Sequence, residues 1–131
     1  MKSQESRENY LEAILVLSTQ KPMVRSIDVA NYLEFSKPSV SVAVANLKSA
    51  LLLTVDQDGG LHLTEAGYAL ASQIYERHTT LTRCLVMMGV NPETAEEDAC
   101  RIEHCISEES FACLKNCLKM LEEKKGVSAN G

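Results

Sequence analysis

The sequence predicts a mostly α-helical protein in which an N-terminal winged helix-turn-helix is followed by a second helical domain. Apolar residues recur at helical spacing through most of the 131 residues. Two short β-prone runs in LLLTVDQDGGLHLT interrupt that pattern after three predicted helices. The order helix, short helix, turn, helix, hairpin is that of a winged helix-turn-helix. We therefore expect residues 1–70 and 71–125 to form two domains, with 126–131 as a flexible tail.

Each element of the predicted N-terminal domain has a local signal. The first helix should cover roughly residues 4–20, because Lys21-Pro22 breaks its apolar period. Ser26 is expected to cap a second helix that ends at Leu33. Pro38 fits the first turn of a third helix, where the missing N–H costs nothing. The inward positions expected on the second and third helices are Ile27, Val29, Ala30, Leu33, Val40, Val44 and Leu47.

The rest of the chain predicts a hairpin and three more helices. Asp58-Gly59-Gly60 marks the hairpin turn. Thr64 should cap a long helix that runs toward Met88 and stops at Gly89. Asn91-Pro92-Glu93 should start a fifth helix that carries EDACRIEHCIS at residues 97–107. Ser107 should start a sixth helix, frayed after Lys124, with one apolar face made of Phe111, Leu114, Leu118 and Leu121.

Charge and composition limit the classes of function. The net charge is −5, and neither residues 1–80 (7 Lys/Arg, 9 Asp/Glu) nor 81–131 (6 Lys/Arg, 9 Asp/Glu) are basic. A generic nucleic-acid binder is therefore disfavoured, and DNA binding would need a local patch or bound cations. No apolar run is long enough for a membrane span, and MKSQESRENY lacks an apolar signal core, so a cytoplasmic protein is expected.

The predicted recognition helix opens with small hydroxyl side chains. Ser36-Lys37-Pro38-Ser39 can enter a major groove or meet phosphates without steric clash. The glycine-tipped hairpin adds a wing that can reach the neighbouring groove or backbone. Because helix-turn-helix units also occur in folds that never touch DNA, an inert scaffold is the alternative.

A second set of polar residues has the chemistry of a metal site. In a helix, Cys100, Glu103 and His104 sit at i, i+3 and i+4 and share one face. His78 ends the polar face of the fourth predicted helix, and Asn9 pairs with Glu12 on the first. Six nitrogen, oxygen and sulfur donors on three helices would suit a first-row divalent metal, if they converge. Taken singly, each has a structural alternative: a small buried thiol, or a solvated helix face.

The five cysteines show no C-x-x-C pair, so reduced thiols are expected. Cys113 and Cys117 lie at i, i+4 among leucines, which favours packing in the core or an interface over a metal or redox pair. Cys84 and Cys105 are also expected to be structural. An enzyme that uses Cys100 and His104 as a thiolate–imidazole pair ranks last, because no oxyanion donor or substrate cleft is apparent.

The chain resembles the DtxR/MntR family of metal-dependent transcriptional repressors over nearly its whole length. The resemblance is carried by ENYLEAILVL, IDVANYLEFSKPSVSVAVANL, LHLTEAGYALA, YERHTTL and, most specifically, D-A-C-R-x-E-H within EDACRIEHCIS. It implies a helical metal-binding and dimerisation domain after the winged helix, double-stranded operator DNA as partner and a homodimer. As in the manganese-type two-domain members, the family's SH3-like domain is not part of this sequence.

The resemblance implies a ligand set. Glu103, His104 and His78 match metal-binding residues of both branches of the family, and Glu12 matches a glutamate of the manganese branch. Cys100 stands where the iron-responsive branch has a cysteine and the manganese branch usually a glutamate. Asn9 replaces a methionine or aspartate, and Thr82 and Glu96 replace a glutamate and a histidine of the iron sensors' ancillary site.

These residues lead us to expect Fe(II), because a thiolate makes the set softer, with Mn(II) the alternative and other first-row metals able to bind in vitro. The DNA contacts implied are Ser36, Pro38, Ser39, Ser41 and Val42, beside Lys37. Metal bound by the first, fourth and fifth helices would fix the angle between the domains and so the spacing of two recognition helices in a dimer. The alternative is a metal-independent winged-helix regulator, whose DNA binding would ignore a chelator.

Overall fold

The computed structural model describes the backbone of residues 2–130 and the side chains of residues 6–124, and its packing divides within α4 into two units, residues 1–74 and 75–131. Each unit is described by itself. The described helices and strands are α1 (Lys2–Gln20), α2 (Ser26–Leu33), α3 (Lys37–Ser49), β1 (Leu53–Val55), β2 (Leu61–Leu63), α4 (Glu65–Met87), α5 (Pro92–Ile102) and α6 (Glu108–Asn130).

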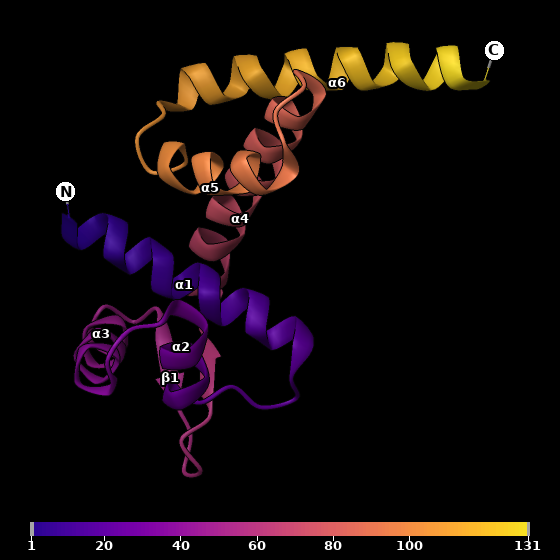
Figure 1. Ribbon diagram of the computed structural model, residues 1–131. Coiled ribbons are helices and arrows are strands. Elements are labelled where there is room, and N and C mark those ends of the chain that lie inside the picture. Colours follow the sequence, from indigo (N-terminus) through magenta and orange to yellow (C-terminus); the bar gives the residue numbers. More distant parts are fainter. Residues whose placement is uncertain (1, 131) are drawn as a thin grey trace. The chain divides into compact units, whose positions relative to one another are not determined.

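The first unit is a winged helix-turn-helix, as predicted (Figure 1). Three helices and the hairpin enclose one apolar core, to which α1 contributes Leu11 and Ile14 at 0% exposure and α2 contributes Val29. From α3, Val40 and Leu47 complete that core. The predicted inward stripe of α2 is wrong at one position, because Ile27 is 41% exposed.

The helix-turn-helix is fixed by its caps. The Ser36 Oγ accepts a hydrogen bond from the Ser39 N–H at 3.3 Å and begins α3. The prediction that Ser26 caps α2 is wrong: Ser26 is the first helical residue and Arg25 is the cap. The Asp28 carboxylate accepts from the Arg25 N–H at 2.9 Å, because an acid at the third helical position can reach back to the cap.

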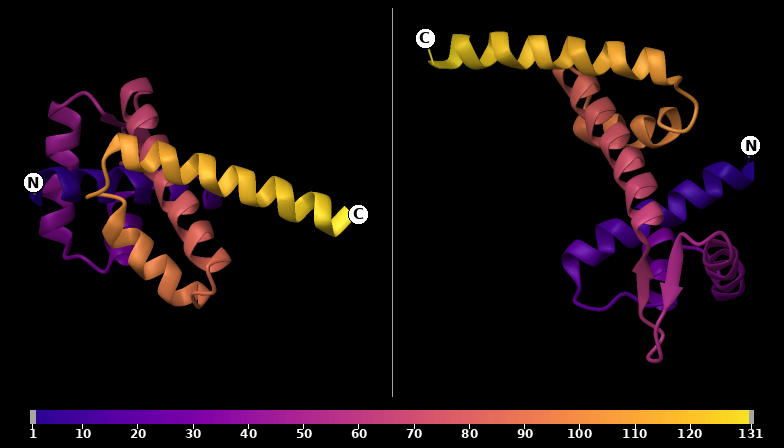
Figure 2. Two further views of the ribbon diagram at one scale, coloured as in Figure 1. Left: turned by 90° about the horizontal axis from the view of Figure 1, so that it is seen from above. Right: turned by 180° about the vertical axis from the view of Figure 1, so that it is seen from behind.

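The wing is a two-stranded antiparallel hairpin that pairs Leu53 with Leu63 (Figure 2, right). Asp56 organises its turn, because its carboxylate accepts hydrogen bonds from the Asp58 and Gly60 N–H groups and contacts His62 Nε2 at 2.7 Å. That contact from His62, followed by the Gly60 N–H, holds the pKa of Asp56 below its ordinary value. The turn is therefore ordered by an acidic side chain.

The second unit contains the later part of α4 with α5 and α6. Asn91 caps α5 as predicted, with its Oδ1 accepting from the Glu93 N–H at 2.9 Å. The prediction that one helix carries all of EDACRIEHCIS is wrong, because α5 ends at Ile102 and residues 103–105 form a turn. At the other end, α6 continues past Lys124 to Asn130, where fraying was predicted.

The apolar face predicted for α6 is only partly buried within the chain. Leu118 is 4% exposed, whereas Leu121 is 47% exposed. Cys113 and Cys117 are exposed, so the core part of their predicted packing is wrong. All five cysteines fall in the described part of the chain, and none forms a disulfide. Among the described helices, none combines the length and apolar composition needed to cross a bilayer.

Candidate metal centre and DNA-facing helix

His78, Cys100 and Glu103 meet in the second unit. One ligand atom from each, an imidazole nitrogen, the thiol sulfur and a carboxylate oxygen, lies within 4.8 Å of the other two. At metal–ligand distances of about 2.0–2.3 Å, opposite ligands of one ion are up to about 4.6 Å apart. The group therefore has the spacing of a site for a single ion, and among the described residues it is the one cluster of three or more such side chains.

Small residues and one continued backbone bond bring these donors together. Ala95 and Ala99 of α5 are both 0% exposed and give that helix a close-packing face. Although α5 ends at Ile102, the Glu103 N–H still bonds to the Ala99 carbonyl at 2.9 Å, and Glu103 keeps right-handed helical angles (φ −57°, ψ −25°). Cys100 and Glu103 thus retain the i, i+3 relation on which the prediction depended.

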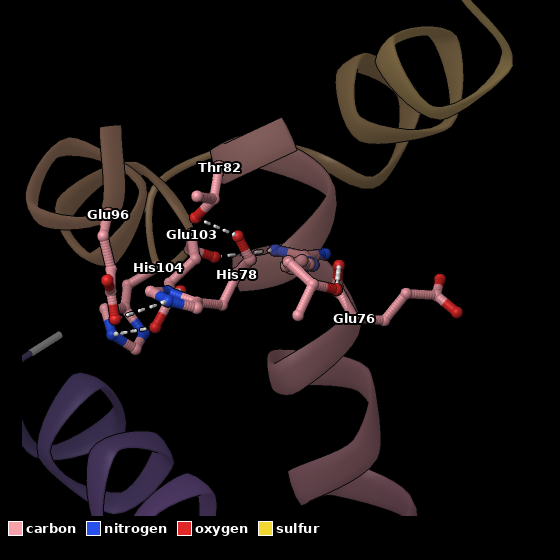
Figure 3. Close-up of polar contacts among 8 residues, drawn as sticks. Glu76, His78, Thr82, Glu96, Glu103 and His104 are labelled. Atoms are coloured by element: carbon pink, nitrogen blue, oxygen red, sulfur yellow. Dashed lines mark hydrogen bonds and ion pairs between the residues drawn. The ribbon is translucent and has the colours of Figure 1, made fainter. Parts of the chain in front are cut away.

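The Glu103 carboxylate is the buried centre of the group (Figure 3). Its Oε2 lies 2.8 Å from His78 Nδ1. Its Oε1 is buried without a hydrogen bond, and His104 Nε2 lies 3.4 Å away. A buried carboxylate oxygen with no donor is costly, and a divalent cation removes that cost. This orphaned oxygen beside a thiol and an imidazole is the observation that fits a metal.

Two neighbours extend the polar cluster. The Glu96 Oε1 lies 4.0 Å from His78 Nε2, and its side chain is 71% exposed (Figure 3). From the sequence, Glu96 was noted only as a departure from the iron sensors. Its position one turn before Cys100 on α5 could have indicated that it lies near the metal-binding side chains. The His104 side chain is 3% exposed and adjoins Glu103, but it is not one of the three clustered residues. Its role as a ligand stays a prediction.

Asn9 and Glu12 are half-buried on α1 in the first unit. Their part in the site stays a prediction. The convergence of His78, Cys100 and Glu103 is a property of the second unit alone.

The predicted DNA-contacting side chains share the exposed face of the first two turns of α3. These side chains are Ser36, Lys37, Pro38, Ser39, Ser41 and Val42. Val42 is 62% exposed, so its apolar side chain is accessible at this face. An open groove of about 740 Å³ runs between α1 and this face, lined in part by Tyr10, Phe35, Pro38 and Val42.

The aromatic part of that groove was missed at the sequence level. Tyr10 and Phe35 make an edge-to-face contact with ring centroids 5.8 Å apart. Burial raises the pKa of the Tyr10 hydroxyl above its ordinary value. Spacing gave no signal for this pair, because Tyr10 lies on α1 and Phe35 in the turn between α2 and α3.

Comparison with known proteins identifies the family. Residues 2–61 match the model described as "Iron dependent repressor, N-terminal DNA binding domain", and residues 64–126 match "Iron dependent repressor, metal binding and dimerisation domain". The Transcriptional regulator MntR of Escherichia coli is 31% identical over 120 residues, which cover 92% of this chain and 75% of that protein. The chain belongs to the iron-dependent repressor family.

Other relatives agree with this assignment. The Diphtheria toxin repressor of Corynebacterium diphtheriae is 31% identical over 116 residues, 88% of this chain and 51% of that protein. The structure titled "Structure of the manganese regulator SloR" matches with a TM-score of 0.77 and 28% identity, over 86% of this chain and 53% of that one. The chain thus spans about half the length of these two relatives.

Membership in the family confirms several predictions. It supports a metal-responsive DNA-binding repressor with a dimerisation domain, and so DNA and a second copy of the chain as partners. It does not favour the metal-independent alternative. The family consists of transcriptional repressors and not of enzymes, which leaves the thiolate–imidazole hypothesis without support.

Proposed function

We propose that this protein is a cytoplasmic repressor whose binding to operator DNA depends on a divalent metal held at His78, Cys100 and Glu103. The observation that carries the proposal is the buried Glu103 oxygen beside a thiol and an imidazole nitrogen. A divalent cation held by these three residues would supply the positive charge that this carboxylate lacks. Residues 71–125 form the metal-binding and dimerising part, and residues 1–70 the DNA-binding part.

We propose His104, Asn9 and Glu12 as further ligands. His104 is supported by its burial and by its 3.4 Å approach to the orphaned Glu103 oxygen. For the two α1 residues, support comes from the family resemblance. Replacing Asn9 or Glu12 by alanine should weaken metal affinity, and unchanged affinity in both variants would remove α1 from the ligand set.

For the metal itself we propose Fe(II), with Mn(II) as the alternative. Cys100 offers a thiolate, which is softer than a carboxylate and therefore favours Fe(II) over Mn(II). The E. coli relative is named MntR, and another solved relative is titled a manganese regulator, which points to Mn(II). Cys100→Glu should therefore shift the preference toward Mn(II), measured as the ratio of the two affinities.

At the DNA we propose that α3 lies in the major groove. Ser36, Lys37 and Ser39 stand at the N-terminal end of α3, where hydroxyls, an ammonium and helix N–H groups favour phosphate. Ser41 and Pro38 lie beside them on the exposed face. Val42 can contribute only apolar contact, for example with a thymine methyl.

Anaerobic fluorescence anisotropy with DNA from the protein's own upstream region tests the function. Tight, saturable binding is expected with Fe(II) or Mn(II), and weak binding with chelator. Glu103→Ala and His104→Ala should abolish this metal dependence while the dimer stays folded. Glu97→Ala is the matched control, because Glu97 is an exposed acid on α5. Binding that ignores chelator in the parent protein would contradict metal control, and unchanged metal dependence in Glu103→Ala would contradict this site.

A further inference from the structure

Arg77 joins three elements of the second unit around the turn that carries Glu103. Its Nη1 donates hydrogen bonds to two backbone carbonyls, that of Glu103 at 3.2 Å and that of Ile106 at 3.0 Å. Its guanidinium carbon also lies 5.5 Å from the centre of the Phe111 ring on α6. A single half-buried side chain of α4 thereby contacts both sides of the α5–α6 turn.

The end of α5 needs such a partner. The last carbonyls of a helix have no intrahelical donor and carry partial negative charge. A guanidinium satisfies them with directed hydrogen bonds and a full positive charge. Phe111 covers the guanidinium from the side of α6, where a cation over an aromatic face is attracted to it.

Glu103 is held from both directions by this arrangement. Its N–H is bonded to the Ala99 carbonyl, which continues α5, and the turn beyond it is tied to α5 by bonds from the Cys105 and Ile106 N–H groups to the Ile102 carbonyl. The carbonyl of Glu103 itself accepts its hydrogen bond from Arg77. His78, the next residue of α4, contacts the carboxylate of the same glutamate at 2.8 Å. Two consecutive residues of α4 therefore contact Glu103: Arg77 binds its backbone carbonyl and His78 binds its carboxylate.

We propose that Arg77 is a positioning residue for the metal centre, which sets metal affinity by holding the Glu103 backbone. This inference rests on the metal centre proposed above. A ligand carboxylate must stay within about 0.5 Å of its productive place, which a turn without this clamp does not ensure. Groups that orient metal ligands typically change affinity by about 10–100-fold when removed.

Co(II) titration of the full chain, followed by absorption, tests the proposal. The thiolate-to-metal band reports on the Cys100 bond, and the d–d bands report on coordination geometry. Arg77→Met is expected to weaken Co(II) affinity by about 10–100-fold and to alter the d–d bands. Arg77→Lys, which keeps the charge but loses the planar fork, should lose less.

Arg83→Met is the matched control, because Arg83 is also an α4 arginine and pairs with Glu122 of α6, away from the turn. It should keep the affinity and spectrum of the parent. Circular dichroism reports whether each variant folds. If Arg77→Met does not fold, the Co(II) affinity and spectrum of Arg77→Lys test the proposal in its place.

A folded Arg77 variant with reduced thermal stability but parental Co(II) affinity and spectrum would overturn the positioning role and leave a structural one. If Cys100→Ser and Glu103→Gln bind Co(II) as the parent does, the metal centre itself fails, and this inference fails with it. If these two variants lose binding while Arg77→Met does not, only the positioning role is refuted.

Discussion

Glu103→Gln should make the metal-free protein more stable and the metal-loaded protein less stable than the parent. The Glu103 side chain is 0% exposed, and one of its oxygens lacks a hydrogen bond. An unsatisfied buried polar atom costs about 1–3 kcal/mol, and more when it is charged. The amide preserves shape and the contact with His78 but removes the buried charge. We therefore expect a gain of about 1 kcal/mol without metal, or roughly 3–5 °C in Tm.

With metal the order should reverse. At about 1,000 times Kd, ligand binding stabilises a native state by about 4 kcal/mol. If the amide weakens binding about 100-fold, the same metal concentration gives the variant only about 1.4 kcal/mol. The parent gains about 2.7 kcal/mol more from the metal than the variant does, which exceeds the variant's advantage of about 1 kcal/mol without it.

The assay is thermal unfolding of both proteins in chelator and in excess Mn(II). Glu97→Gln, at an exposed acid of α5, should move neither curve. A variant that is less stable than the parent in chelator would refute the reasoning, because it would show that the buried carboxylate stabilises the metal-free fold.

Two further predictions concern the DNA-binding unit. The pKa of Asp28 is lowered mainly by the hydrogen bond from Lys21 Nζ at 2.5 Å. The Asp28 carboxylate therefore stabilises the folded state above its unfolded pKa, and this stabilisation is lost as the pH falls through its folded pKa. Asp28→Asn should thus lower the free energy of unfolding, measured with denaturant, by about 1 kcal/mol at neutral pH and leave it unchanged near pH 2. An equal loss at both pH values would contradict this. Gly67→Ala should destabilise the fold by about 2 kcal/mol despite the better helix propensity of alanine. The reason is that the added Cβ would lie 2.0 Å from the Leu52 carbonyl oxygen. Equal or higher stability of the variant in urea unfolding would show that the backbone moves to accommodate the methyl group.

Local signals predicted most of the fold. Pro38 located the start of α3, and the Asp58-Gly59-Gly60 turn located the hairpin, because both depend on the chemistry of a few adjacent residues. Ser26 was wrong as a cap because the acid at Asp28 can serve the same end of the helix from inside it. Apolar periodicity showed where faces lie, but it could not distinguish burial within one chain from exposure, as Ile27 shows.

The sequence named three donors that the structure brings together, but it did not give their geometry. Cys100 and Glu103 carried a spacing signal, whereas the meeting of both with His78 depends on how α4 packs against α5. The end of α5 at Ile102 had no clear signal, since the residues after it are not helix breakers. Arg77 could not have been identified, because it acts through backbone carbonyls, which every residue carries.

The contacts around Glu103 divide into those that hold its place and those that leave its charge unbalanced. Arg77 and the Ala99 carbonyl fix its backbone, while the carboxylate has one hydrogen bond to His78 and one orphaned oxygen. A site that is rigid but electrostatically incomplete gains most from a cation, because little ordering remains to oppose binding. If the backbone clamp were absent, a cation would also have to order the turn, and its affinity would fall. The proposed metal centre thus predicts that metal responsiveness requires both the Arg77 contact and the unsatisfied oxygen, and the Arg77 and Glu103 variants test these two requirements separately.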